Sequence, residues 1–120
     1  MIMFAVRTIF SEPGRLKREV EDLAAAGQLP GTLTGASDPL DFLLHPDGAD
    51  SVIDACYRYA RHTDGADVVL FGTSSLEHLE SNLTSIAKPA LPEADVAKIE
   101  DLFQHLEGIG LDLPDPNKRI

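Results

Sequence analysis

The hydrophobic pattern of this chain begins with two short apolar runs, each followed by a helical pattern. Residues 2–9 and 68–71 are nearly continuous in apolar side chains, which is typical of strands covered on both faces. Apolar positions recur at helical spacing in residues 16–23, 52–60, 76–86 and 96–106. Strands that alternate with helices in this way predict an α/β fold with parallel strands.

Local signals mark where these helices begin and end. Ser11 with Pro13 is a predicted start and Gly27 a predicted stop for the first helix. Two capping boxes, Ser51 with Asp54 and Ser74 with Glu77, predict the starts of the next two helices, and Ile86 ends the apolar stripe of the second. Lys88-Pro89 predicts the stop before the last helix, which Gly108 closes. Residues 28–50 form a long connection in which residues 40–44 could dock as a helical turn or a short strand.

The predicted sheet is too small to be complete. Only two strands are evident, and both have the composition of strands that need cover on two faces. Since a two-stranded parallel sheet is not a stable unit by itself, the predicted elements leave the core too small.

Composition narrows the classes of partner. The chain has 120 residues, with 10 Lys and Arg against 20 Asp and Glu, for a net charge of −10. This charge argues against nucleic acid and anionic membrane surfaces as partners. No apolar run reaches the roughly 20 residues of a membrane span, and residues 1–7 lack the basic region of a signal peptide. The single cysteine, Cys56, excludes an intrachain disulfide and favours a cytoplasmic protein.

The turn at Gly72, Thr73 and Ser74 is the local motif with the clearest chemistry. It lies between a predicted strand and a predicted helix, where backbone N–H groups and the helix dipole can bind a phosphate. Glycine allows close approach of a ligand, and the hydroxyl groups can donate to phosphate oxygens. The alternative is a plain N-cap in which Ser74 satisfies its own helix, and the local pattern alone favours that alternative.

Other polar side chains give weaker signals. The four histidines show no metal-binding spacing, so we expect no metal site. Cys56 lies on an apolar stripe, which predicts a buried and inert thiol. His78 and Asn82 are four residues apart and share one side of the predicted helix. A ligand at its amino end could contact both, or they could form a rim that contacts only water.

Residues 72–82, Gly-Thr-Ser-Ser-Leu-Glu-His-Leu-Glu-Ser-Asn, resemble the last strand–helix cofactor segment of the aldo/keto reductases. Residues 89–95 resemble the linker before that family's C-terminal helix, and residues 50–60 resemble the helix before its last barrel strand. The resemblance covers about residues 38–103. Residues 1–33 agree only in the order of their elements.

This resemblance implies a partial (β/α)8 TIM barrel: a single partial domain over residues 1–120, with residues 111–120 as a frayed tail. It implies binding of NADP or NAD through Gly72, Thr73, Ser74, His78 and Asn82, in an enzyme that reduces carbonyl groups with NAD(P)H. The family's catalytic Asp, Tyr, Lys and His lie on earlier strands, and no residue here matches them. We therefore expect the isolated chain to be catalytically inactive.

Three departures from the family concern the cofactor. Members that select the 2′-phosphate often carry Lys at the position of Gly72 and Arg at that of His78, and many carry an acid at that of Ser81. The choice between NAD and NADP is therefore open, and weak binding is expected. An alternative is a truncated, non-catalytic module that forms homo-oligomers through open strand edges. A small phosphate-binding regulator ranks third.

Overall fold

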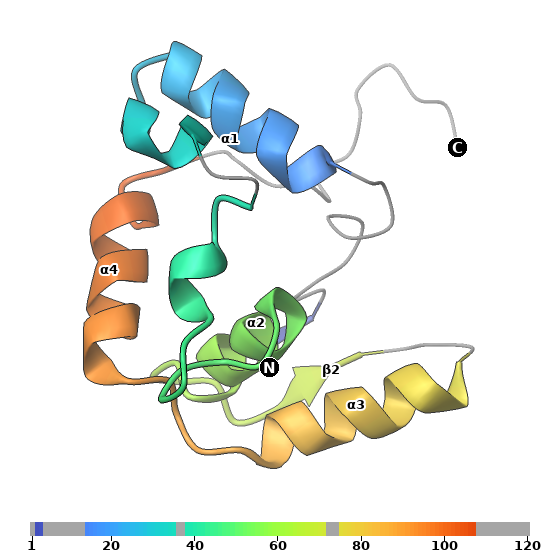
Figure 1. The fold of residues 1–120 in the computed structure, drawn as a ribbon. Helices are drawn as coiled ribbons and strands as arrows, with labels where there is room; N and C mark the ends of the chain where they lie inside the picture. Colours follow the sequence, from blue (N-terminus) through green and yellow to red (C-terminus); the bar gives the residue numbers. More distant parts are fainter. Residues whose placement is uncertain (1, 4–13, 36–37, 72–74, 108–120) are drawn as a thin grey trace, which may run out of the picture.

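Helices make up most of the structure, a computed structural model that describes residues 2–3, 14–35, 38–71 and 75–107. The described residues form four α-helices, two short 3-10 helices and one pair of very short strands (Figure 1). In chain order the elements are β1 (Ile2–Met3), α1 (Arg15–Ala25), η1 (Gly31–Gly35), η2 (Asp41–Leu43), α2 (Val52–Arg61), β2 (Val69–Leu70), α3 (Leu76–Ala87) and α4 (Glu93–Phe103).

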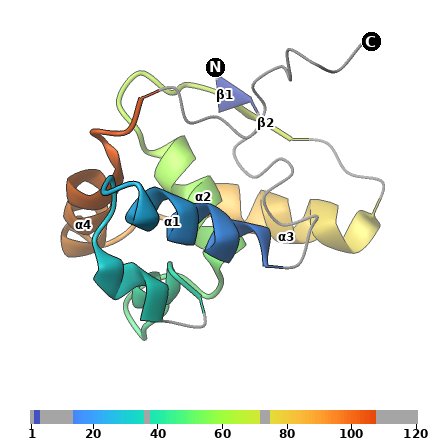
Figure 2. The same cartoon turned by 90° about the horizontal axis from the view of Figure 1, so that it is seen from above.

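The prediction of an α/β fold that is part of a (β/α)8 barrel is wrong. In the described residues the only strand pairing joins Ile2 to Val69 and Met3 to Leu70 in parallel, and no barrel fragment forms (Figure 2). The apolar run at residues 68–71 was expected to be buried on both faces, but Val68 and Leu70 are exposed. The run is apolar enough for an inner strand of a sheet. In the described residues, however, it pairs only with β1, and its side chains Val68 and Leu70 are not covered on both faces. Most of the apolar run at residues 2–9 lies outside the described residues.

Glycine ends helix α1 as predicted. The amide of Gly27 donates to the carbonyl of Ala24 and that of Gln28 to the carbonyl of Leu23, at 3.0 and 2.9 Å. Gly27 takes the left-handed conformation (φ 77°) that this Schellman motif requires. The predicted start at Ser11 and Pro13 lies outside the described residues, and α1 begins at Arg15 after Gly14.

Serine hydroxyls cap both helices that were expected to begin with a capping box. The Ser51 hydroxyl accepts from the Asp54 amide at 3.0 Å, so the predicted start of α2 is confirmed. Helix α3 begins one residue later than predicted, since Ser75 and not Ser74 is its N-cap residue. It ends at Ala87 because Lys88, which precedes a proline, takes an extended conformation. Helix α4 ends at Phe103, before the predicted stop at Gly108, which lies outside the described residues.

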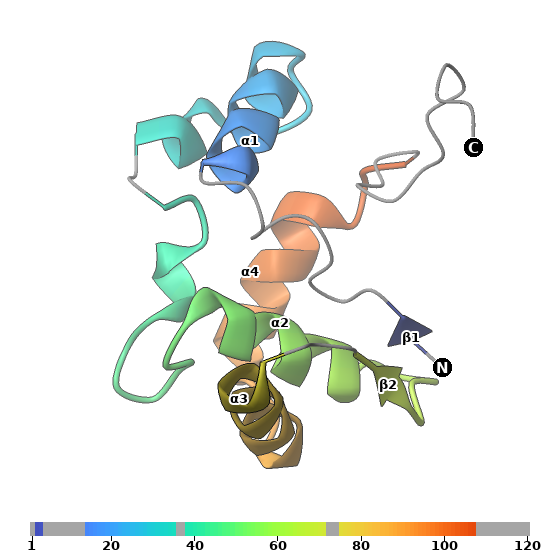
Figure 3. The same cartoon turned by 90° about the vertical axis from the view of Figure 1, so that its right-hand side faces the viewer.

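Helix α4 joins two small apolar cores. In Figures 1 and 3 it runs from the region of α2 and α3 toward α1. Val96 and Ile99 pack on the core of Leu43, Ala49, Ala55 and Leu91. Leu102 and Phe103 pack on the core formed by Val20, Leu29 and Leu33. The predicted apolar stripe of this helix is therefore confirmed. Of the helical turn and the short strand that were the alternatives for residues 40–44, the structure forms the turn, η2, which adds Leu43 to the first core.

Candidate functional site

The amino end of α3 is where the sequence predicts a ligand. The Ser75 hydroxyl accepts from the amide of His78 at 3.3 Å, and the side chains of Leu76, Glu77 and His78 in the first turn are exposed. Of the five residues predicted to bind the cofactor, Gly72, Thr73 and Ser74 lie outside the described residues. The structure therefore describes the capped start of α3 and the exposed imidazole of His78, but not the Gly72–Ser74 turn before them.

Asn82 does not join His78 at an exposed rim. Its side chain is 9% exposed, while that of His78, one turn earlier, is exposed. Asn82 and Ser85 are the buried residues of α3, and α2 is the element that α3 contacts most. The two predicted binding residues share a helix side, as their spacing requires, but only His78 is accessible to a ligand.

The leucine stripe of α3 faces solvent instead of the core. Leu76, Leu79 and Leu83 are 70%, 37% and 54% exposed, although their spacing predicted a core face, and Ile86 is half-buried. The prediction failed because a periodic stripe specifies a face but not what covers it. In the described residues α2 is the main neighbour of α3, whose buried residues are Asn82 and Ser85, and the three leucines stay exposed.

A buried ionic cluster lies between α2 and the carboxyl end of α3, and sequence reasoning missed it. Asp54 and Arg58, 3% and 6% exposed, form an ion pair at 3.3 Å. The guanidinium also donates to the carbonyl groups of Gly48, Pro89 and Ala90 at 2.9 to 3.3 Å. This cluster attaches the loop before α2 and the linker before α4 to one arginine. Opposite charges four residues apart on an otherwise apolar helix face were the signal in the sequence.

Lys88 completes this cluster from the end of α3. Its ammonium donates to Asp50 at 2.6 Å and to Asp54 at 3.1 Å. Burial alone would raise the pKa of the Asp54 carboxyl, but hydrogen bonds from Ser85 and Lys88 lower it below its usual value. The hydrogen bond to Asp50 is the main reason why the pKa of Lys88 is raised. Because each of its four charged side chains has an oppositely charged partner, the cluster stabilises the fold and offers no free reactive group.

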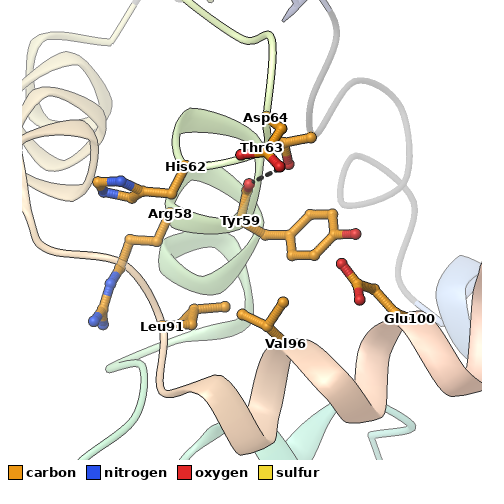
Figure 4. Close-up of a pocket in the computed structure, with 8 residues that line it drawn as sticks. All are labelled: Arg58, Tyr59, His62, Thr63, Asp64, Leu91, Val96 and Glu100. Atoms are coloured by element: carbon orange, nitrogen blue, oxygen red, sulfur yellow. Dashed lines mark hydrogen bonds between the residues drawn. The ribbon is translucent and has the colours of Figure 1, made fainter.

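A cavity of about 300 Å³ opens between the carboxyl end of α2 and α4 (Figure 4). Leu91 and Val96 form an apolar part of its lining, and Tyr59 contributes an aromatic ring. In Figure 4 the Tyr59 hydroxyl and the Glu100 carboxylate point toward one another. Burial, and then the negative charge of Glu100, raise the pKa of the Tyr59 phenol. The remaining lining residues are Arg58, His62, Thr63 and Asp64.

Cys56 and metal binding were two further candidates that the sequence raised. Cys56 is half-buried, and burial raises the pKa of its thiol to about 11, with the charge of Asp38 adding to this effect. A raised pKa lowers the fraction of reactive thiolate, which supports the expected inert thiol. The described residues contain no group of three or more His, Cys, Asp and Glu side chains that could hold a metal ion. Among the helices described, none has the length and apolar character needed to cross a membrane.

Comparisons of the chain with protein-family models, with curated proteins and with solved structures gave no match. The candidate site therefore has to be judged on its own residues.

Proposed function

We propose that the chain binds a nicotinamide dinucleotide at the amino end of α3, as the cofactor-binding portion of an NAD(P)H-dependent oxidoreductase similar to the aldo/keto reductases. The observation that carries this proposal is the exposed, serine-capped start of α3, which is the next described element after β2 in the chain. The sequence resemblance of residues 72–82 supports it independently. The barrel fold is not part of its support.

The phosphate would be held by the first turn of α3. The amide groups at a helix start have no partners within the helix, and the helix dipole places partial positive charge there. His78 lies on this turn with its side chain exposed, where the imidazole can donate to a phosphate or stack on a base. Asn82 is left out of the proposed contacts, because its buried side chain lies on the face that meets α2.

The chain would supply binding and no chemistry. No residue matches the family's catalytic Asp, Tyr, Lys and His, so hydride transfer to a carbonyl requires groups from elsewhere in the functional enzyme. The charge of −10 and the nearby Glu77 and Glu80 oppose an anionic ligand. We therefore propose weak binding with no strong preference between NADH and NADPH, in a cytoplasmic enzyme.

Calorimetric titration of the purified chain with NADPH and with NADH tests this proposal. Saturable binding should be weakened by His78→Ala and abolished by Gly72→Asp, which adds a carboxylate to the phosphate turn. His105→Ala is the matched control, since His105 is an exposed histidine whose ring bonds the carbonyl of Gln28, far from α3 in the chain. A wild-type chain that binds neither nucleotide would refute the proposal, as would equal losses in all three variants.

A second function, a non-catalytic module that self-associates, is favoured by the exposed leucines of α3. Seven large apolar side chains are exposed in the described residues, and five of them, from Val68 to Leu83, belong to β2, its flank and α3. A second copy of this chain would fit such a surface, because an uncharged leucine stripe is complementary to itself. The strand edges that the sequence suggested for this contact are only two residues long. Sedimentation equilibrium over a range of concentrations should show a dimer, and a monomer at every concentration would exclude this function.

A further inference from the structure

The cavity between α2 and α4 has the lining of a cation site. Its floor includes the buried Leu91 and the half-buried Val96, and one wall is the ring of Tyr59 (Figure 4). An apolar floor beside an aromatic face suits the carbon stem of a small organic molecule, and the ring face attracts a cation. This lining distinguishes the cavity from a patch of surface acids.

The hydrogen-bond donors that Arg58 and His62 bring to the cavity lining are largely engaged by other groups. Four of the five N–H groups of Arg58 are engaged by three carbonyl groups and the Asp54 carboxylate. The Nε2 atom of His62 lies 3.0 Å from the backbone carbonyl of Lys88. Because a carbonyl oxygen can only accept, Nε2 donates this hydrogen bond, and it does so to a residue outside the cavity lining. In Figure 4 both side chains extend away from Tyr59 and Glu100. An anionic ligand would therefore find few donors.

The remaining polar groups of the lining accept hydrogen bonds. Glu100 and Asp64 are carboxylates with no ion pair in the part of the chain that the structure describes. The Thr63 hydroxyl gives its proton to the carbonyl of Tyr59 at 2.7 Å, which leaves its lone pairs to accept. The carboxyl end of α2 adds the negative end of the helix dipole.

We propose that this cavity binds a small primary alkylammonium ion. The ammonium group would donate to the Glu100 carboxylate beside the Tyr59 ring, while the alkyl stem lies on Leu91 and Val96. The site is separate from the amino end of α3 and does not depend on the proposed function.

Titration of the chain with n-butylammonium chloride, followed by two-dimensional NMR at constant ionic strength, tests this assignment. We expect saturable shifts confined to the residues of the lining. Neutral n-butanol and ammonium chloride should give much weaker binding, because each lacks either the charge or the alkyl stem. Equal binding of butanol would show an apolar cleft without cation selectivity and would overturn the proposal.

Two substitutions on α4 provide a matched pair. Glu100→Gln and Asp101→Asn each remove one negative charge, but only Glu100 lines the cavity. Loss of a charged hydrogen-bond partner should weaken binding about tenfold in Glu100→Gln, with little change in Asp101→Asn. Both side chains are exposed, so both variants should fold, and unfolding midpoints verify this. Equal weakening in both, or no saturable binding by the wild-type chain, would refute the site.

Discussion

Helices α2 and α3 have similar sequence patterns but opposite relations to the rest of the molecule. Each starts at a serine cap, and each carries apolar side chains at helical spacing. Helix α2 buries Val52, Tyr57 and Ala60, together with its Asp54–Arg58 ion pair. Helix α3 buries Asn82 and Ser85 and exposes its leucines. The number of packing partners, rather than the amphipathic pattern, separates the two helices.

The difference shows what an amphipathic pattern does and does not specify. Helix α2 contacts η2, β2 and α3, and its Tyr57 ring meets Phe71 edge-on at 5.6 Å between ring centroids. Helix α3 has α2 as its main neighbour among the described elements. A leucine stripe stabilises a fold only when another surface removes it from water. The stripe of α3 is therefore available to a partner.

Breaking the ionic cluster of α2 should have the largest effect on stability. Arg58→Ala removes one partner of buried Asp54, which keeps Lys88, and leaves the carbonyl groups of Gly48, Pro89 and Ala90 without their Arg58 donor. Removing one partner of a buried ion pair costs about 3–5 kcal/mol, which we expect in urea unfolding. Arg61→Ala, on the same helix but half-exposed and outside the cluster, should change the unfolding free energy by less than about 0.5 kcal/mol. Equal effects of both variants would contradict the role of the cluster.

Acid should weaken the same cluster. Burial opposes ionisation of Asp54, but hydrogen bonds from Ser85 and Lys88 hold its pKa in the folded chain below the 3.8 that applies to the unfolded chain. Asp54 therefore adds stability that is fully present above that value and is lost as pH falls through the folded pKa. Unfolding midpoints of the wild type and of Asp54→Asn should differ most at neutral pH and converge below about pH 4. A difference that persists unchanged in acid would mean that the Asp54 charge does not stabilise the fold.

The two serine caps allow a direct comparison of smaller effects. Ser51 caps α2 at 3.0 Å in a partly buried setting, while Ser75 caps α3 at 3.3 Å in an exposed one. Replacing an N-cap serine by alanine costs about 1 kcal/mol, so Ser51→Ala should lose that amount and Ser75→Ala less. Thermal unfolding of both variants gives the two values. A larger loss in Ser75→Ala would show that α3 contributes more to stability than its contacts suggest.

The sequence predicted the local features of the fold well. The Ser51 cap, the Gly27 stop and the Lys88–Pro89 stop depend on side chains within a few residues of each other, and all three are confirmed. The apolar stripe of α4 was also predicted correctly, and residues 40–44 form the helical turn that was one of the two forms expected there. Short-range hydrogen bonds and backbone preferences determine such features, so the local sequence carries the information.

The overall fold and the candidate site were harder to predict, because both depend on contacts between distant residues. The barrel was inferred from a resemblance and from apolar runs, yet β1 and β2 pair over only two residues. His78 and Asn82 share a helix side, but the packing of α2 leaves only His78 accessible. The cavity is lined by both Tyr59 on α2 and Glu100 on α4, two residues 41 positions apart in the chain. Nothing in the spacing of these residues indicates that they meet.

Substitutions in the leucine stripe of α3 should have the smallest effect on the stability of the single chain. Leu83→Gln replaces a side chain that is about half exposed and belongs to neither of the two core clusters of the described residues, so the unfolding free energy should change by less than about 0.5 kcal/mol.

Leu43→Ala, in the core at 2% exposure, is the contrasting variant and should cost about 2–5 kcal/mol. If the chain dimerises through α3, Leu83→Gln should abolish the dimer in sedimentation while the unfolding of the monomer stays as it was. Leu43→Ala should lower stability and, where the chain remains folded, leave association intact. A marked loss of monomer stability in Leu83→Gln would mean that the stripe is covered within a single chain, and the contrast between α2 and α3 would then disappear.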